Sequence, residues 1–352
     1  MNKEGIRVSL SLTKRTITIS ADEMSTPQGY TVLDHDLIAA ANAAMVLGKP
    51  LLLTGEPGIG KSEFARWLAA QSPACDLFQF VVKSNTEASE LFYQFDAVAR
   101  FRDAQLANLR GVTDGQSESE SQGQRQQLHK YLRYNALGTA ILHSLGSDQA
   151  ERMGVISPAL GESYRRFPAQ ATRSVVLIDE IDKAPRDVPN DILDEILHRR
   201  FRIPELDIEE VQANPALLPI VVITSNSERD LPRAFLRRCI YYHMRLRDDV
   251  ALLLQIAANR IGRRFSADSS LLGDCIRMFV HLRTEVSLNQ KPGFAELLDW
   301  LAALAGDVPA PARRLGVDDK AIMKAALLKD TRDQELADRD WDSWRARVVS
   351  QA

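Results

Sequence analysis

The segment Gly55-Glu-Pro-Gly-Ile-Gly-Lys-Ser62 combines glycines, a lysine and a hydroxyl group in a spacing that suits phosphate binding. The glycines let successive backbone N–H groups turn toward phosphate oxygens, and a following helix adds the positive end of its dipole. Lys61 can then reach the β and γ phosphates, and Ser62 can ligate Mg²⁺. The apolar run LLLT before the loop and EFARWLAAQ after it supply the strand and helix that this motif requires, whereas a plain glycine turn requires neither. We therefore predict an ATP·Mg²⁺ site formed by Gly55, Glu56, Pro57, Gly58, Ile59, Gly60, Lys61 and Ser62.

Two carboxylates follow a second apolar run, VVLIDEID. Asp179 and Glu180 would stand at the carboxyl end of a buried strand, which is where ligands bind in open α/β sheets. We expect Asp179 to hold Mg²⁺ together with Ser62, and Glu180 to polarise the water that attacks the γ-phosphate. On its own, an apolar run that ends in two acids is as often a strand entering solvent, but the phosphate-binding loop upstream favours the catalytic interpretation.

Two further polar segments accompany later strands. The run PIVVIT is followed by Asn226, whose amide would orient the attacking water, although a lone asparagine at a strand end is usually a turn former. Arg237 and Arg238 directly precede the next apolar run. Each is either a surface charge or the cation that reaches the γ-phosphate bound by a neighbouring subunit.

Short apolar runs predict the strands that position these residues, and helical patterns lie between them. Runs without alternation suit strands buried on both faces of a parallel sheet, so we predict a doubly wound α/β domain with a five-stranded parallel sheet. After Leu246 the strand signals end and helical patterns repeat, which predicts a small α-helical lid. The predicted strands are Pro50–Thr54, Leu77–Val82, Ser174–Ile178, Pro219–Thr224 and Cys239–Met244. The predicted lid helices are Asp248–Ile261, Ser269–Leu282, Pro292–Leu304, Asp318–Leu328 and a charged stretch through Trp341 and Trp344.

The predicted domain organisation has three parts. Residues 1–29 form an appendage, because Ile6 to Ile19 alternate apolar and polar as in a hairpin. Residues 30–246 form the α/β domain, with an insertion around 96–170, and residues 247–352 form the lid. Within the insertion, residues 111–127 contain almost no apolar side chain and are expected to be a surface loop.

Composition limits the function classes. The formal net charge is −3 and the isoelectric point about 6.1, so the whole chain does not attract nucleic acid electrostatically. The cysteines Cys75, Cys239 and Cys275 form no C-x-x-C pair, which favours reduced core thiols over a zinc site. No apolar stretch approaches the length of a membrane span, and the N-terminus has no secretory signal. We expect a cytoplasmic protein that does not bind membranes.

The motif order GEPGIGKS, VVLIDEIDKAPRDVPNDIL, FRIPEL, VVITSN and AFLRRC resembles the MoxR branch of the AAA+ ATPases, which is related to the CbbQ/NorQ-type activators and the dynein-related AAA group. The resemblance covers roughly Val32 to Leu301. It implies a P-loop AAA+ core with a helical lid, ring oligomers that are commonly hexamers, and remodelling of a protein client, often with a partner that carries a von Willebrand factor A domain. It also implies that Asn226 is sensor 1, that Arg238 rather than Arg237 is the arginine finger, and that Ala136–Leu145 belongs to an insertion facing the pore.

One segment departs from that family. A sensor-2 arginine usually opens a lid helix, but the stretch LNQKPGFAELLDWL contains no arginine and only Lys291 nearby. Phe92 and Tyr93 are either pore-loop aromatics or core side chains, and the four tryptophans are expected to be packing residues. The favoured function is an ATP-driven protein remodeller. A nucleic-acid motor or loader is disfavoured by the acidic balance, and a nucleotide-gated scaffold is disfavoured by the intact Asp179-Glu180 pair.

Overall fold

The computed structural model describes residues 34–71, 75–109, 127–185, 188–226, 231–261, 265, 269–305 and 313–350 of the 352-residue chain. Its contacts divide the chain into two compact units. The first contains His35–Thr54 and Ala65–Tyr242, and the second contains Gly55–Phe64 and the residues from His243 onward. The predicted appendage at 1–29 and nearly all of the loop at 111–127 lie outside the described residues, and the predicted domain limits stay a proposal.

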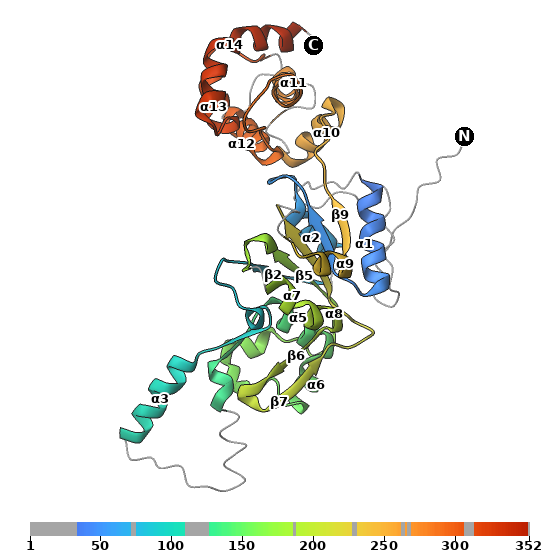
Figure 1. Ribbon diagram of the computed structural model, residues 1–352, viewed down its shortest axis with the longest axis vertical. Helices are drawn as coiled ribbons and strands as arrows, with labels where there is room; N and C mark the ends of the chain where they lie inside the picture. The colour runs from blue at the N-terminus through green and yellow to red at the C-terminus, as the bar shows by residue number, and fades with distance from the viewer. Residues whose placement is uncertain are drawn as a thin grey trace, which may run out of the picture. The chain divides into compact units, whose positions relative to one another are not determined.

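A five-stranded sheet with the order β2-β5-β8-β1-β9 forms the centre of the first unit (Figure 1). Strands β2, β5, β8 and β1 pair in parallel. The fold is therefore a parallel α/β core followed by a helical part, as the apolar runs predict, with each strand within two residues of its expected limits. The strands are β1 (Leu51–Thr54), β2 (Asp76–Val81), β5 (Ser174–Asp179), β8 (Ile220–Ser225) and β9 (Ile240–His243).

Burial differs between the centre and the edges of this sheet. Strands β1 and β8 are buried throughout, and β5 is buried up to Ile178. The edge strands are not: Val81 on β2 is 46% exposed and Tyr241 on β9 is 42% exposed. The prediction of burial on both faces was therefore wrong for β2 and β9, because an edge strand has a neighbour on one side only and its apolar run looks the same in sequence.

The region predicted as an insertion contributes to the core of the first unit. Helix α5 (Ala136–Leu145) is buried along almost its whole length and packs on β5 and β2. It comes so close to Phe92 that a Cβ on Gly138 would lie 2.1 Å from the Phe92 carbonyl oxygen. The segment Ala136–Leu145 was expected to belong to an insertion facing the pore; in the structure this apolar helix covers a face of the sheet, and its side chains pack in the core.

Two small two-stranded sheets in the first unit were not predicted, since strands of three to five residues carry little periodicity. One pairs β3 (Tyr93–Phe95) with β4 (Leu132–Tyr134), and the other pairs β6 (Arg200–Ile203) with β7 (Ile208–Gln212). Phe92, before β3, is 4% exposed and stacks on Phe201 of β6 with ring centroids 5.3 Å apart. Of the two interpretations of Phe92, the core one is confirmed.

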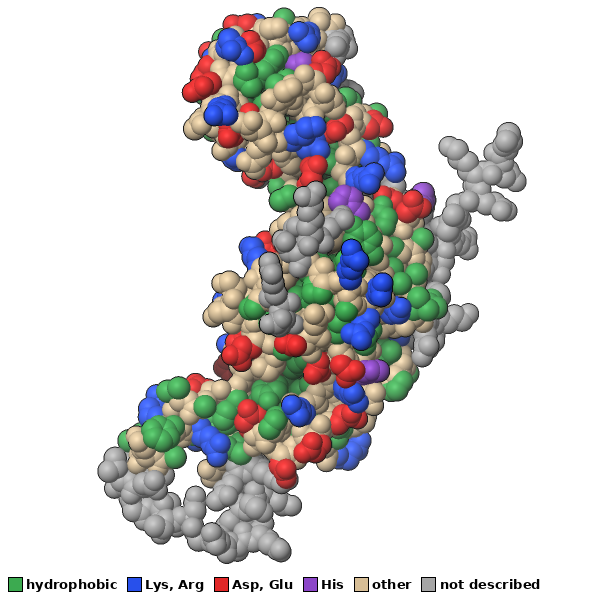
Figure 2. Space-filling model, in the orientation of Figure 1, with side chains coloured by type: hydrophobic (Ala, Val, Ile, Leu, Met, Phe, Trp, Pro, Cys, Tyr) green, Lys and Arg blue, Asp and Glu red, His purple; other side chains and the backbone are tan. Residues whose placement is uncertain are grey.

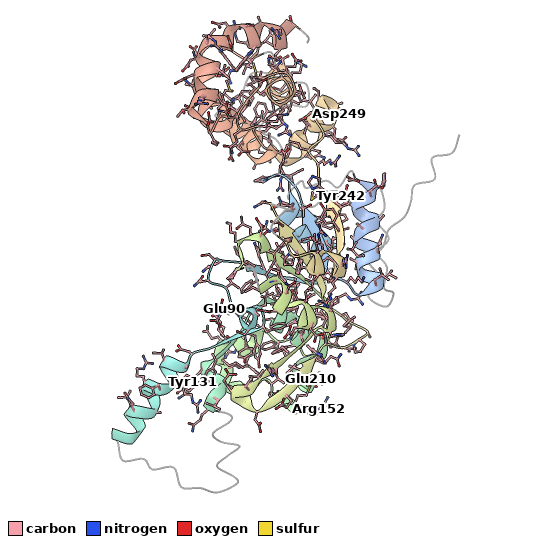
Figure 3. All side chains as sticks on the ribbon, viewed as in Figure 1. Glu90, Tyr131, Arg152, Glu210, Tyr242 and Asp249 are labelled. Atoms are coloured by element: carbon pink, nitrogen blue, oxygen red, sulfur yellow. The ribbon has the colours of Figure 1, made fainter. Side chains whose placement is uncertain are left out.

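Helix α3 (Ala97–Leu109) follows β3 and extends away from the rest of the first unit (Figure 1). Val98 and Phe101 on it are 80% and 65% exposed, and Figure 2 shows hydrophobic and basic side chains together on this helix. The Tyr131 hydroxyl, labelled in Figure 3, donates to Asp103 Oδ2 at 2.9 Å and ties the helix to the residues before β4. The remaining segments of the first unit are α1 (His35–Leu47), η2 (Ala88–Leu91), η3 (His129–Tyr131), α6 (Ser147–Arg152), η4 (Pro158–Arg166), η5 (Ile181–Lys183), α7 (Val188–Asp191), α8 (Leu193–His198), η6 (Pro204–Leu206) and α9 (Arg233–Arg238).

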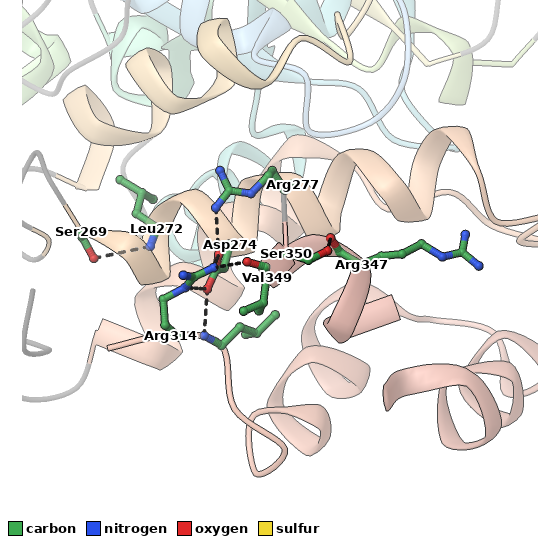
Figure 4. Close-up of polar contacts among 9 residues, drawn as sticks. Ser269, Leu272, Asp274, Arg277, Arg314, Arg347, Val349 and Ser350 are labelled. Atoms are coloured by element: carbon green, nitrogen blue, oxygen red, sulfur yellow. Dashed lines mark hydrogen bonds and ion pairs between the residues drawn. The ribbon is translucent and has the colours of Figure 1, made fainter. Parts of the chain in front are cut away.

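The second unit is helical after β9 and has its own core. Trp300, Trp341 and Trp344 are at most 6% exposed, which confirms their predicted packing role, and Trp67 is buried in the first unit. The fully buried Asp274 accepts hydrogen bonds from Arg277, Arg314 and the Leu315 N–H (Figure 4). Among the described residues, no helix is both long enough and apolar enough to span a bilayer. The helices are α10 (Val250–Ile261), α11 (Ser270–Thr284), α12 (Phe294–Ala305), α13 (Lys320–Leu327) and α14 (Thr331–Ser350).

Candidate functional site

The glycine-rich loop lies between β1 and α2 (Lys61–Ala70), as predicted. Gly55, Gly58 and Gly60 have φ values of 137°, 74° and 100°, a region that side chains with a Cβ rarely enter. These conformations bend the backbone around the side chain of Lys61. The Lys61 ammonium donates to the carbonyl oxygens of Gly55 at 2.8 Å and Glu56 at 2.9 Å. The residue is only 7% exposed, so the loop curls around its own lysine.

The helix after the loop has the features of an anion-binding terminus. Helix α2 begins at Lys61 itself, and the Phe64 N–H makes a helical bond to the Gly60 carbonyl at 3.0 Å. The amides of the first turn of a helix have no partner within the helix, and they carry its positive partial charge. The N-terminus of α2 and the Lys61 ammonium therefore present positive charge within one short segment.

The carboxyl ends of three neighbouring strands meet at one edge of the sheet in the first unit. Thr54 pairs with Ser225 at the ends of β1 and β8, and Asp179 ends β5, the other neighbour of β8. Asp179 Oδ1 accepts the Thr224 hydroxyl at 2.5 Å, and Asp179 Oδ2 accepts Gln79 Nε2 at 3.1 Å. Both oxygens are thus oriented by side chains from the adjacent strands.

Glu180 follows β5 in a left-handed conformation, with φ of 61° and ψ of 49°. This conformation is uncommon for a residue with a side chain and is found preferentially at functional sites. Its N–H donates to Thr224 Oγ1 at 3.0 Å, and its Oε2 accepts the Lys183 ammonium at 2.6 Å. The hydrogen bond to Glu180 raises the pKa of Lys183 above its ordinary value, so this lysine is charged at neutral pH. The structure therefore brings the two predicted carboxylates to one sheet edge and adds Thr224 and Lys183, which the sequence alone did not indicate.

Asn226 directly follows β8, next to the end of β5. The residue is exposed, and its N–H donates to Asp182 Oδ1 at 3.1 Å. Its position one residue beyond the strand is the predicted one, at the same sheet edge as Asp179. Asn226 is therefore attached at the sheet edge that also carries Asp179 and Glu180.

Arg237 and Arg238 occupy the last turn of α9, and both are exposed. In the described part of the chain, neither donates a hydrogen bond to a residue of the sheet edge. The structure thus leaves them as surface cations of the first unit. An exposed arginine with no carboxylate bound to its guanidinium is available to another chain.

A cation of the second unit reaches the glycine-rich loop, but it is not the one considered from the sequence. Lys291 is exposed, whereas Arg283, in the last turn of α11, is 4% exposed and donates to both side-chain oxygens of Glu56. Sequence reasoning missed Arg283 because it lies eight residues before Lys291, at the end of α11, whereas Lys291 lies in the segment between α11 and α12. An arginine in the last turn of a helix is common, and nothing in its spacing marks it as buried.

The sequence was also compared with known proteins. The family model described as AAA domain (dynein-related subfamily) matches residues 50–239, which is more than half of the chain and includes the loop, the Asp179-Glu180 pair, Asn226 and the two arginines of α9. No curated protein matches the chain significantly. The chain therefore belongs to the AAA domain family, in its dynein-related subfamily.

Proposed function

We propose that this protein binds ATP·Mg²⁺ at the loop Gly55–Ser62, hydrolyses it, and uses the energy to remodel a protein client. The observation that carries this proposal is the arrangement of Lys61, a nearly buried ammonium held by two main-chain carbonyls of a loop with three positive-φ glycines. The two neutral carbonyl oxygens bind the Lys61 ammonium more weakly than charged phosphate oxygens would. Exchange of these acceptors for phosphate explains why a loop would enclose a lysine.

The proposed roles follow from the chemistry of each group. The Ser62 hydroxyl and the Asp179 carboxylate are hard oxygen donors of the kind that Mg²⁺ prefers, and the ion neutralises phosphate charge when bound. Glu180 accepts a proton from the attacking water, and Asn226 orients that water. Thr224 holds Asp179 and the backbone of Glu180 at the same time.

The exposed Arg238 supports a proposal about assembly. We infer that copies of the chain form a ring, by the resemblance a hexamer, in which Arg238, or else Arg237, acts on the nucleotide of a neighbouring subunit. The same proposal assigns the chain to the MoxR-like branch, locates it in the cytoplasm and gives it a partner with a von Willebrand factor A domain. They rest on the motif resemblance and on the dynein-related family match.

Two variants test the nucleotide site. Lys61→Ala should lose ATP binding measured by calorimetry while keeping its circular dichroism spectrum, because it removes the phosphate-binding charge and alanine is well tolerated at the first residue of α2. Glu180→Gln should bind ATP but hydrolyse it very slowly, because an amide cannot accept the proton. Unchanged ATP affinity of Lys61→Ala, or near-normal turnover of Glu180→Gln, would contradict the assigned roles.

A third measurement tests the client class. ATPase activity should rise on addition of a protein partner, and it should not rise with DNA or RNA at physiological ionic strength. Stimulation by nucleic acid together with salt-sensitive binding would favour the motor or loader instead. Binding of ATP without turnover under either condition would favour a nucleotide-gated scaffold.

A further inference from the structure

Within the second unit, Arg283 binds the glycine-rich loop through a charged residue of that loop. Its Nη1 donates to Glu56 Oε2 at 3.0 Å and its Nη2 donates to Glu56 Oε1 at 3.3 Å, a two-pronged pairing of guanidinium and carboxylate. Its Nε donates to Asp248 Oδ1 at 2.6 Å, and its Nη1 also donates to the Pro292 carbonyl at 2.7 Å. One side chain thus connects α11, the segment before α10, the segment before α12 and the loop.

The two carboxylates around Arg283 stabilise its charge in spite of its burial. Burial lowers the pKa of the guanidinium, but hydrogen bonds to Glu56 and Asp248 outweigh that effect, so the pKa is raised overall. The Phe279 ring, 5.7 Å from the guanidinium carbon, adds a cation–π contact. Arg283 is the buried member of the pair, whereas Glu56 is 52% exposed, and Asp248 still compensates the guanidinium charge when the charge of Glu56 is removed. Arg283 is therefore held in place by the same carboxylate that belongs to the loop.

Further contacts fix the same part of the loop. A Cβ on Gly58 would lie 2.7 Å from the Ala295 Cβ, and a Cβ on Gly293 would lie 2.9 Å from the Pro57 carbonyl oxygen. The beginning of α12 therefore touches the loop without a cation. The position at which the family resemblance would place a sensor-2 arginine is occupied here by close apolar and backbone packing.

The main chain and the side chain of Glu56 each bind a different cation. Its carbonyl oxygen accepts the Lys61 ammonium, and its carboxylate accepts Arg283. If Lys61 leaves this carbonyl to bind a phosphate, Glu56 loses its contact with Lys61 while its carboxylate stays bound to Arg283.

We propose that Arg283 is a positioning residue that transmits nucleotide binding from the loop to the helical unit through Glu56. This inference rests on the proposed ATP site. Lys61 changes partner when nucleotide binds, Glu56 loses one of its two cationic contacts, and the change reaches α11 through the guanidinium. The helical unit thus senses the loop backbone, and no lid cation on the nucleotide itself is required.

The experiment uses the full chain, three single variants of the Arg283–Glu56 pair, one control variant and one double variant. Glu56→Gln removes the charge from a side chain that is 52% exposed, and it keeps the shape, so it is not expected to disturb folding. Arg283→Met and Arg283→Lys remove the two-pronged pairing. Arg277→Met is the matched control, because Arg277 lies on the same helix and pairs with Asp274, which keeps its bonds to Arg314 and the Leu315 N–H.

Two readouts are measured in each protein: hydrogen exchange of the α11 amides with and without ATP, and the separate values of kcat and KM. In the parent chain and in Arg277→Met, ATP should slow exchange in α11. In Glu56→Gln and in both Arg283 variants this effect of ATP should disappear, kcat should fall about tenfold or more, and KM should change less than kcat. The double variant Glu56→Gln/Arg283→Met should have the same kcat as either single variant, since each single substitution already removes the contact between Arg283 and Glu56.

The outcomes separate this inference from the proposed function. ATP-dependent protection of α11 and normal kcat in Glu56→Gln, with ATP binding intact, would overturn the role of the Arg283–Glu56 pair. Equal ATP binding by Lys61→Ala and the parent chain would instead reject the ATP site itself. If Arg283→Met fails to fold, Glu56→Gln still decides the question.

Discussion

Thr224, the fifth residue of β8, donates its hydroxyl to Asp179 Oδ1 on the neighbouring strand at 2.5 Å. The hydroxyl oxygen of Thr224 in turn accepts the N–H of Glu180 at 3.0 Å. Thr224 is 1% exposed, so its hydroxyl has few other partners and holds both carboxylate residues in one arrangement. A threonine that looks like a strand residue in the sequence is therefore part of the candidate catalytic site.

Thr224→Val should reduce kcat while leaving the fold intact, because valine has nearly the same shape but offers no hydroxyl to Asp179 or Glu180. We expect a loss of about 10- to 100-fold, the range found when a residue that orients a metal ligand is removed. Steady-state kinetics at several Mg²⁺ concentrations measure it, and the Mg²⁺ requirement should rise. Thr224→Ser, which restores the hydroxyl, should recover most of the activity; equal rates for valine and serine would remove Thr224 from the site.

Lys183 gives a second prediction. Its ammonium lies 2.6 Å from Glu180 Oε2, and the side chains of Lys183 and Glu180 are 54% and 32% exposed. The bond occupies an oxygen that must accept a proton, while an exposed pair of this kind adds little stability. Lys183→Met should therefore raise the basal ATPase rate a few-fold at pH 7 with an unchanged melting temperature. A decrease in the rate would mean that Lys183 assists Glu180 and does not restrain it.

The sequence predicted the fold and the positions of the candidate site residues because both depend on local patterns. Continuous apolar runs located all five strands of the main sheet within two residues, and the loop and acidic motifs placed Lys61, Asp179 and Glu180. These patterns say which residue type stands at a strand end. They do not say which neighbour it contacts.

The parts that could not be predicted depend on long-range pairing. Thr224 meets Asp179 because β8 and β5 are adjacent, although 45 residues separate the two side chains in sequence. Arg283 meets Glu56 across 227 residues. The packing of α5 on the sheet was not predicted for the same reason, because an apolar helix in a long insertion has the same sequence pattern whether or not it covers the sheet.

His143 predicts a pH dependence of stability. It is 3% exposed in α5, with its ring 4.8 Å from Phe78 and 5.9 Å from Phe167. Burial lowers the pKa of His143, although Asp76 Oδ2 at 3.4 Å acts in the opposite direction. A group whose pKa is lower in the folded state contributes stability above its unfolded pKa of about 6.5, and that stability is lost as the pH falls through the folded value. Urea unfolding should therefore show a falling midpoint between pH 7 and pH 5.

The variant His143→Gln should make that decline shallower, because glutamine does not titrate. Some decline should remain, since burial also lowers the pKa of His129. His198→Gln is the control, because His198 ends α8 with a side chain that is 55% exposed. The same pH dependence in the parent chain and in His143→Gln would contradict the assignment.

The last prediction concerns a site shared between subunits. Arg238 is exposed in the last turn of α9, and no described residue of its own chain binds its guanidinium through a carboxylate at hydrogen-bonding distance. An arginine supplied by a neighbour can increase the rate by about 10³ to 10⁵, far more than a surface ion pair contributes to stability. Arg238→Ala should therefore abolish turnover while keeping ATP affinity.

Mixing two inactive proteins tests whether Arg238 acts in another subunit. Lys61→Ala lacks a working loop, and Arg238→Ala lacks the arginine, but a mixed ring contains interfaces at which an intact loop meets an intact Arg238. ATPase activity should therefore reappear in part on mixing, and it should depend on the ratio of the two proteins. Exchange of subunits is verified separately by fluorescence transfer between labelled chains. If exchange occurs and activity stays absent, or if Arg238→Ala hydrolyses ATP normally, then Arg237 or another cation has the role, and Arg237→Ala in the same mixing experiment distinguishes these two cases.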